Sequence, residues 1–281
     1  MINNKDRIEY YLGNFIYDGF PAESSPEIFD KPFELCKNIK SRSTYDVDLQ
    51  RLYNIKPKKL WVQCGDQPYT GKNKVLVKTR DSFNNESRGI LGKLNTWRHW
   101  NFLLKEDWDW TYKKPDVIWR GADTGNNPIN NDRLDFVKKF HTTLNVGFSC
   151  WQQNKKISPE DYLQEYLKQP VNINNLLKFK YHPIIDGNDK SSSLNWVLKS
   201  NCLPIMPKPR FHSWACEKFL EPGVHYVECK RDFSDFLDKV EMCKSNDDEA
   251  KQIAQNGKNF MKIFSDTENE IKIEKDLLAL I

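Results

Sequence analysis

The sequence predicts an α/β fold in which short buried strands alternate with amphipathic helices. Apolar runs at 116–119, 144–149 and 203–206 have the length and composition of buried strands. A helical pattern at 131–141 separates the first two runs, and 178–201 contains the pattern of a strand, a glycine turn and a short helix. Because strands that alternate with helices pair in parallel through right-handed crossovers, these elements predict a parallel sheet.

The length and composition describe a globular protein. The chain has 281 residues, enough for one large domain or two small ones. The 43 basic and 39 acidic residues give a net charge of +4, which is too small to favour a nucleic-acid-binding module. The nine Trp and eleven Tyr suit sugar-binding platforms, although aromatic side chains also fill ordinary cores.

The sequence predicts a cytoplasmic protein without a membrane span. Residues 1–10 are polar and lack the apolar centre of a signal peptide. No run of about 18 apolar residues occurs, and the seven Cys form no CxxC pair and are expected to be reduced thiols. The abundance of Asn, Lys and Ile indicates an AT-rich bacterial or viral genome, and a viral protein would act in the host cytoplasm.

The first part of the chain contains one candidate catalytic residue. Beyond a short aromatic-rich helix expected at 8–20, residues 1–58 carry little information. The apolar run 60–64 predicts a strand that ends at Gly65-Asp66-Gln67-Pro68, and 75–78 predicts another strand. Since α/β proteins place reactive groups at the carboxyl ends of strands, Asp66 is a candidate, although Asp is also a common turn residue.

Two further patterns before residue 116 have alternative interpretations. His99 is a candidate acid/base or acceptor contact, or a structural hydrogen-bonding residue. Asp107 and Asp109 form a DxD pattern that can hold a divalent metal, but they lie at an expected helix end, 102–110, rather than after a buried strand. No other His, Cys, Asp and Glu cluster has metal-ligand spacing, so no metal cofactor is predicted.

Two arginines and one polar turn suit a phosphorylated ligand. The strand at 116–119 runs into Arg120, and Arg133 follows in the next helix. The planar guanidinium of Arg donates to two oxygens at once, which suits a diphosphate, although either Arg can equally form a surface salt bridge.

The turn after the strand at 178–185 leads into a helix that is expected to be capped by serine. Backbone N–H groups and a helix N-terminus suit a phosphate, but an ordinary α/β turn has the same pattern. The polar residues of this turn are Gly187, Asn188, Asp189, Ser191, Ser192 and Ser193.

The patterns between and after these segments complete the predicted series. The expected elements are a helix that begins at Ser158, a helix at 213–220 that carries Glu217, a strand at 225–229, helices at 234–243 and after Asn246, and a helical tail from Asp266.

Several segments together resemble a known family. They are Asp66-x-Pro68, WRG at 119–121 with Arg133, GNDKSSSLNW at 187–196, SWACE at 213–217 and PGVHYV at 222–227. This combination resembles the lipopolysaccharide-modifying branch of the family-90 glycosyltransferases, a family that includes protein O-glucosyltransferases and xylosyltransferases. The resemblance implies a GT-B architecture, with two Rossmann-like domains facing across a cleft. The implied parts are an acceptor-binding domain at 1–115, a nucleotide-sugar-binding domain at 116–265 and a helix at 266–281 that crosses back to the first domain.

The resemblance also implies a reaction and roles for individual residues. It implies inverting transfer of a sugar, xylose as first choice and glucose as second, from a UDP-sugar to a hydroxyl of a glycan or lipopolysaccharide, without a metal. Asp66 would be the catalytic base and His99 an acceptor contact. The donor contacts would be Arg120, Arg133, Gly187, Asn188, Asp189, Ser191, Ser192, Ser193 and, through the ribose, Glu217.

The chain also departs from the family pattern. The protein O-glucosyltransferases carry an Arg where this chain has Ser193, so their donor contacts do not transfer completely. Glu217 is otherwise a solvated helix carboxylate. A non-catalytic nucleotide-sugar-binding protein remains the alternative.

Overall fold

The chain divides into two compact units. A computed structural model describes residues 2–18, 28–29, 45–55, 60–66, 69–100, 107–125, 132–152 and 162–281. The first unit is formed by Met1–Phe102, Pro209–Phe219 and Ile263–Ile281, and the second by Leu103–Lys208 and Leu220–Lys262. The first unit thus contains 209–219, which the sequence-based division placed in the second domain. The start of the helix predicted at Ser158 lies outside the described residues, as do Gln67 and Pro68.

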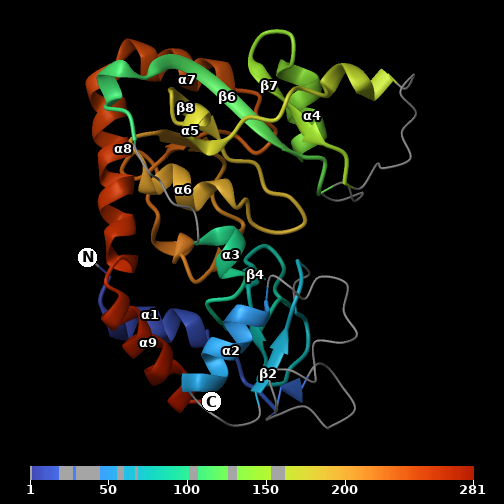
Figure 1. The fold of residues 1–281 in the computed structure, drawn as a ribbon, viewed down its shortest axis with the longest axis vertical. Helices are drawn as coiled ribbons and strands as arrows, with labels where there is room; N and C mark the ends of the chain where they lie inside the picture. Colours follow the sequence, from blue (N-terminus) through green and yellow to red (C-terminus); the bar gives the residue numbers. More distant parts are fainter. Residues whose placement is uncertain are drawn as a thin grey trace. The chain divides into compact units, whose positions relative to one another are not determined.

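The second unit is built on a five-stranded parallel sheet (Figure 1). Its strands are β6 (Lys114–Ala122), β7 (Asn145–Cys150), β8 (Phe179–Pro183), β9 (Leu203–Met206) and β11 (Val227–Glu228). Every neighbouring pair runs in parallel. The predicted α/β class with a parallel sheet is therefore confirmed, whereas the GT-B arrangement of two domains stays a prediction.

The order of these strands shows where a ligand is expected to bind in the second unit. The spatial order is β11-β9-β8-β6-β7, so the chain first adds β7 on one side of β6 and then adds β8 and its successors on the other. The order of addition reverses between β6 and β8. In open α/β sheets ligands bind outside the carboxyl ends of the strands at such a reversal.

Helices cover this sheet and bury its apolar side chains. They are α4 (Asp132–Phe140), α5 (Ile173–Leu176), α6 (Ser193–Lys199), α7 (Phe236–Ser245) and α8 (Asp247–Met261). Phe136, Val137 and Phe140 of α4 enter the core together with Val146 and Phe148 of β7. Within the described residues, no helix of either unit is long and apolar enough to cross a membrane.

Some local predictions for the second unit differ from the structure. The helix predicted from Ser158 is described only from Tyr162, where Tyr162–Tyr166 forms a 3₁₀ helix. The helix end predicted at 102–110 was wrong for Asp107–Asp109, which has no helical structure. The predicted cap at Asn246 was also wrong: Asn246 lies at the N-cap position of α8, but its side chain makes no capping hydrogen bond, and its amide donates to the carbonyl of Met242 in the preceding helix.

The first unit combines a mostly parallel sheet with a separate antiparallel pair. The sheet has the order β1-β2-β3-β5, in which only the pairing of β1 with β2 is antiparallel. Its strands are β1 (Ile28–Phe29), β2 (Leu60–Gln63), β3 (Leu76–Val77) and β5 (Ile90–Leu91), and the separate pair is β4 (Thr79–Asp81) with β10 (Phe211–Ser213).

The pairing of β4 with β10 explains why the helix predicted at 213–220 was wrong. Ser213 pairs with Thr79 and is therefore extended, and only Glu217–Phe219 forms a 3₁₀ turn. The local pattern of 213–220 is compatible with a helix, so the long-range strand pairing decides the outcome.

The α-helices that the structure describes in the first unit are α1 (Asn4–Leu12), α2 (Asp46–Ile55), α3 (Thr96–His99) and α9 (Thr267–Ala279). The helix expected at 8–20 begins earlier, because the side chain of Asn3 accepts from the N–H of Asp6. It ends at Gly13, whose φ of 72° is accessible to glycine at low cost.

A buried carboxylate holds α9 within the first unit. Glu270 accepts from Arg7 of α1 at 2.6 Å, from Lys93 at 3.0 Å and from the indole N–H of Trp214 at 2.8 Å. Arg7 and Glu270 are 1% and 4% exposed, so neither charge is hydrated and each depends on the other. The three segments of the first unit are therefore joined by one charged side chain.

Candidate functional site

The loops that follow β6 and β8 meet at the carboxyl edge of the sheet in the second unit. The backbone N–H of Gly125, after β6, donates to Oδ1 of Asn188, after β8, at 2.9 Å. This direct bond joins the two loops at the place where the strand order reverses. We call residues 122–125 and 184–193 together the crevice loops.

Arg133 reaches these loops from the first turn of α4. Its guanidinium donates to the carbonyl of Ala122 at 2.9 Å and to the hydroxyl of Thr124 at 2.6 Å. It also donates to the carbonyl of Ile185 at 3.2 Å. Arg133 therefore ties both crevice loops together and places its positive charge beside Gly187.

Glycine allows the two loops to approach this closely. A Cβ on Gly187 would lie 2.6 Å from the Thr124 hydroxyl and 3.1 Å from the guanidinium of Arg133. Gly125 has a φ of +93°, and a Cβ there would lie 3.1 Å from the backbone of Gly187. A side chain at position 187 would therefore separate the loops.

The serines of the turn lie at the start of α6. Ser191 and Ser193 share a hydroxyl hydrogen bond of 2.8 Å, and the N–H of Ser191 donates to Oδ1 of Asp186 at 3.1 Å. Ser192 lies at the N-cap position, but its side chain makes no capping bond, contrary to prediction. Because α6 is only seven residues long, the loop rather than the helix end provides the polar surface.

Asp186 is a functional candidate that the sequence pattern did not single out. Burial of the carboxyl group raises its pKa from 3.8 to about 6, although the N–H of Ser191 and the charges of Arg231 and Arg133 act in the opposite direction. The residue as a whole is half-buried, and its carboxyl accepts the N–H of Ser191 at 3.1 Å. Its place after a strand was a usable signal, since reactive groups gather at carboxyl ends, but only the strand order shows that this strand borders the crevice.

The structure does not bring Arg120 to the crevice loops. Its guanidinium donates to the backbone and side-chain oxygens of Asn145 at 2.9 and 2.8 Å and to the carbonyl of Gln169 at 3.1 Å. These bonds fasten β6 to the start of β7 and to the segment before α5. Among the predicted donor contacts, Arg133 lies at the loops and Arg120 does not.

Asp66 lies in the first unit at the carboxyl end of β2. Its carboxylate forms an ion pair with Lys78, which follows the neighbouring strand β3, and a second pair with Arg98 at 3.6 Å. The hydroxyl of Tyr45 accepts from the N–H of Gly65 at 3.1 Å and thereby fixes the preceding turn. Asp66 is 30% exposed, so its carboxylate is oriented by cations yet accessible to a ligand.

The structure places the other two predicted residues in buried positions of the first unit. His99 ends α3 and is 3% exposed. Both carboxylate oxygens of Glu217 accept from Ser213, from its N–H at 2.7 Å and from its hydroxyl at 2.6 Å. Glu217 therefore stabilises the turn after β10, and it is not a solvated carboxylate, being 2% exposed.

The DxD aspartates differ in their surroundings. Asp107 accepts from Lys113 at 2.7 Å and from the N–H of Asn201 at 2.5 Å, whereas Asp109 is exposed. In the part of the chain that the structure describes, no group of three or more His, Cys, Asp and Glu side chains could hold a metal ion.

Comparison with protein families gives a match over more than half of the chain. The family model described as "Glycosyl transferase family 90" matches residues 91–269. This range includes both crevice loops and Arg133, but it does not include Asp66.

Individual relatives extend the similarity. The O-glucosyltransferase LpsA of Dichelobacter nodosus is 27% identical over 269 residues, which cover 95% of this chain and 79% of that protein. Protein O-glucosyltransferase 3 of Homo sapiens is 34% identical over 157 residues, or 53% of this chain and 28% of that protein. Uncharacterized protein 179R of Invertebrate iridescent virus 6 is 26% identical over 200 residues, or 60% of this chain and 17% of that protein. The chain thus spans most of the first relative but less than a third of the other two.

Proposed function

The chain belongs to glycosyl transferase family 90, and from this membership we propose that it transfers glucose from UDP-glucose to a hydroxyl of a glycan or lipopolysaccharide, with inversion at the anomeric carbon. The observation that carries the proposal is the pair of crevice loops joined by Arg133, because they lie within the matched range and at the reversal of strand order.

We propose that the crevice loops bind the diphosphate of the donor. Gly187 presents backbone without a side chain, and the hydroxyls of Ser191 and Ser193 lie 2.8 Å apart on the same turn. The charge of Arg133 would stabilise the diphosphate as it departs, while its bonds to three loop oxygens keep the loops in place. Arg120 would act indirectly, by holding β6 against β7.

The choice of glucose rests on the names of the relatives. Both the bacterial relative and the human one are described as O-glucosyltransferases. These names favour glucose over xylose, so the order of the two sugars is the reverse of the one expected from the sequence. UDP-xylose is the second candidate donor.

We propose Asp66 as the general base. The acceptor hydroxyl would attack the anomeric carbon as its proton passes to the Asp66 carboxylate, and the bond from that carbon to the UDP oxygen would break on the opposite face. UDP would leave with the bonding electron pair, which gives inversion. The accessible edge of Asp66 and its orientation by Lys78 and Arg98 support this role.

The proposal is tested first without an acceptor. Thermal shifts of the full chain would be measured with UDP, UDP-glucose, UDP-xylose and GDP-mannose, and UDP release from each UDP-sugar would be followed over time. We expect stabilisation by the UDP compounds, strongest for UDP-glucose, and slow release of UDP. Stabilisation by GDP-mannose but not by UDP compounds would overturn the donor assignment.

The same assay tests whether the protein turns over its donor and whether turnover needs a divalent metal. Binding of UDP-glucose without any release of UDP, even with glycan acceptors present, would favour the non-catalytic alternative. We propose that no divalent metal is required, because fixed cationic and polar donors can stabilise a leaving diphosphate. Loss of turnover in EDTA that Mn²⁺ restores would contradict this part of the proposal.

A further inference from the structure

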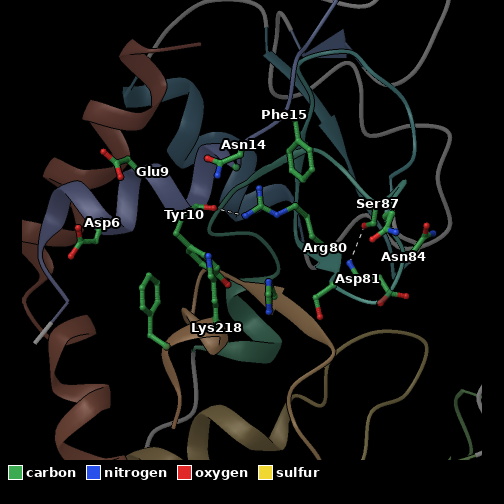
Figure 2. Close-up of a pocket in the computed structure, with 15 residues that line it drawn as sticks. Asp6, Glu9, Tyr10, Asn14, Phe15, Arg80, Asp81, Asn84, Ser87 and Lys218 are labelled. Atoms are coloured by element: carbon green, nitrogen blue, oxygen red, sulfur yellow. Dashed lines mark hydrogen bonds between the residues drawn. The ribbon is translucent and has the colours of Figure 1, made fainter.

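The first unit contains a pocket of about 510 Å³ that the proposed chemistry does not use. Figure 2 shows its lining, which comes from α1 and the residues after it, from β4 and the following turn, and from β10 and the segment after it. Neither Asp66 nor His99 lines it. A volume of this order suits a ligand of one or two sugar rings.

A buried cation forms part of this lining. Arg80 of β4 is 6% exposed, and its guanidinium donates to the carbonyls of Tyr11 and Gly89, both at 3.2 Å, and to that of Tyr10. Across the described ranges, no carboxylate lies within ion-pair distance of it. Buried charges in proteins are normally paired with an opposite charge. Among the residues that the structure describes, Arg80 has no such partner, and an anionic ligand can supply one.

The carboxylates around the pocket do not fulfil this role. Asp81 is already neutralised by Arg210, which donates to both of its oxygens at 2.6 to 3.0 Å. Asp6 and Glu9 belong to the exposed face of α1, and Glu9 pairs with Lys5 at 3.8 Å. In Figure 2, Asp6 and Glu9 lie on one side of the pocket and Asn84 and Ser87 on the other, with Arg80 between them.

The polar groups beside Arg80 are oriented to donate. Oδ1 of Asn84 already accepts from the N–H of Glu86 at 2.9 Å, which leaves the amide N–H groups of Asn84. The hydroxyl oxygen of Ser87 accepts from the N–H of Asp81 at 2.9 Å, which leaves its proton to donate. Two neutral donors and a guanidinium in the lining of one pocket match an oxyanion.

Aromatic rings provide the apolar part of the pocket. The guanidinium of Arg80 lies 5.6 Å from the ring centre of Tyr10 and 5.4 Å from that of Phe15. Phe219 packs edge-on against Tyr10 at 5.4 Å, and both rings line the pocket. Aromatic faces beside hydrogen-bonding groups suit the apolar faces and hydroxyls of a sugar ring.

We propose that this pocket binds an acidic saccharide, with a carboxylate or phosphate group against Arg80, Asn84 and Ser87 and the sugar ring against Tyr10, Phe15 and Phe219. The hydroxyls at the other end of the ligand would face Asp6 and Glu9. Binding as such does not depend on the transfer reaction, whereas the identification of this saccharide as part of the acceptor rests on the proposed function.

Calorimetric titration of the full chain tests the ligand class. The probes are glucuronate, glucose 6-phosphate, glucose and inorganic phosphate. We expect glucuronate or glucose 6-phosphate to bind at least about tenfold more tightly than both glucose and inorganic phosphate, which corresponds to one charge-assisted hydrogen bond. The better of the two acidic sugars identifies the anion as a carboxylate or a phosphate. Equal binding of glucose, equal binding of inorganic phosphate, or no binding of either acidic sugar overturns the proposal.

Two variants test whether the acidic sugar binds in this pocket. Arg80→Gln removes the counterion and is expected to lower the affinity for the acidic sugar by roughly ten- to a hundredfold. Because Arg80 also joins three carbonyls, Asn84→Asp serves as a second variant: it keeps the acceptor for Glu86 and places a negative charge on the pocket wall. We expect Asn84→Asp to lower the affinity for the acidic sugar and to leave the affinity for glucose unchanged. The control variant Asn54→Asp, on the exposed face of α2, is expected to change neither affinity.

Unchanged affinity in folded Asn84→Asp would refute the assignment of the pocket. UDP binding, measured on the same samples, separates this result from the proposed function. Binding of acidic sugars without binding of UDP would support the pocket assignment and overturn the donor assignment. Binding of UDP without binding of acidic sugars would support the donor assignment and overturn the pocket assignment.

Discussion

At the scale of single residues, two aspartates at the carboxyl ends of parallel strands have contrasting surroundings. Asp66 follows β2 and faces the cations of Lys78 and Arg98 at a partly exposed position. Asp186 follows β8, and its carboxyl is enclosed and accepts from the N–H of Ser191. The first arrangement suits a group that meets an acceptor, and the second suits a group that shapes a loop.

The role of Asp66 is tested by Asp66→Asn. We expect this variant to keep its fold and its affinity for UDP but to lose transfer by roughly 10²- to 10⁴-fold, the usual contribution of a general base. Circular dichroism, UDP thermal shift and initial rates would be compared with Asp276→Asn, an exposed carboxylate on α9. Near-normal turnover in Asp66→Asn would remove this residue from the mechanism.

The raised pKa of Asp186 predicts how the stability of the folded protein changes with pH. Because its pKa in the folded protein, about 6, lies above the usual 3.8, the folded state holds the proton more tightly than the unfolded state. The wild-type stability contribution of Asp186 therefore falls as pH rises from about 4 to about 6. Asp186→Asn keeps the acceptor for Ser191 but cannot ionise.

We expect the melting temperature of Asp186→Asn to match that of the wild type near pH 4 and to exceed it above pH 6. Thermal melts at half-unit pH intervals from 4 to 8 would check this. If the difference in melting temperature between Asp186→Asn and the wild type stayed constant over this range, the Asp186 carboxyl would not titrate as described.

At the scale of elements, the crevice loops depend on two glycines rather than on a helix end. Gly187→Ala is expected to displace Thr124 or Arg133, because the new Cβ would lie 2.6 Å from the Thr124 hydroxyl. Overpacking of this kind costs about 1–3 kcal/mol and would weaken UDP binding, since the loops could no longer meet.

The measurements are urea unfolding and UDP titration, with Gly92→Ala as the matched control. A Cβ at Gly92 makes its closest contact at 3.4 Å, an ordinary distance, so we expect that variant to behave as the wild type. Unaltered UDP affinity in folded Gly187→Ala would mean that the loops do not bind the diphosphate.

The helices and strands of the structure show which elements could be predicted from the sequence. The strand predicted at 203–206 has the same bounds in the structure, because a short apolar run between polar turns leaves few alternatives. The helix predicted at 213–220 was wrong because Ser213 pairs with Thr79, a contact across 134 positions of sequence that no local pattern contains. Likewise, the sequence offers both Arg120 and Arg133 as phosphate contacts, and only their long-range hydrogen bonds show which one reaches the crevice loops.

At the scale of the whole molecule, the first unit is assembled from three separated segments that meet at Glu270. Glu270→Gln keeps the shape of the side chain but leaves Arg7, which is 1% exposed, without a negative charge. Breaking a buried ion pair in this way costs roughly 3–5 kcal/mol. Glu268→Gln, on the exposed face of the same helix, is expected to change stability by less than about 0.5 kcal/mol.

Urea unfolding followed by tryptophan fluorescence would report the difference, because Trp214 donates to Glu270. If the two variants were equally stable, Glu270 would not hold α9 in the first unit. The long-range partners of Glu270 could not be predicted from the sequence, since 263 positions separate it from Arg7.

The position of Glu270 late in the chain has a consequence for biosynthesis. Residues 103–208 and 220–262, which form the second unit, all leave the ribosome before Glu270 does. The first unit, although it contains the earliest residues, cannot complete its buried ion pair until α9 has been translated. We therefore expect nascent chains to acquire protease resistance in the second unit first, against the usual N-terminal order. A premature stop codon between residues 262 and 270 would spare the second unit and leave the first one open to degradation.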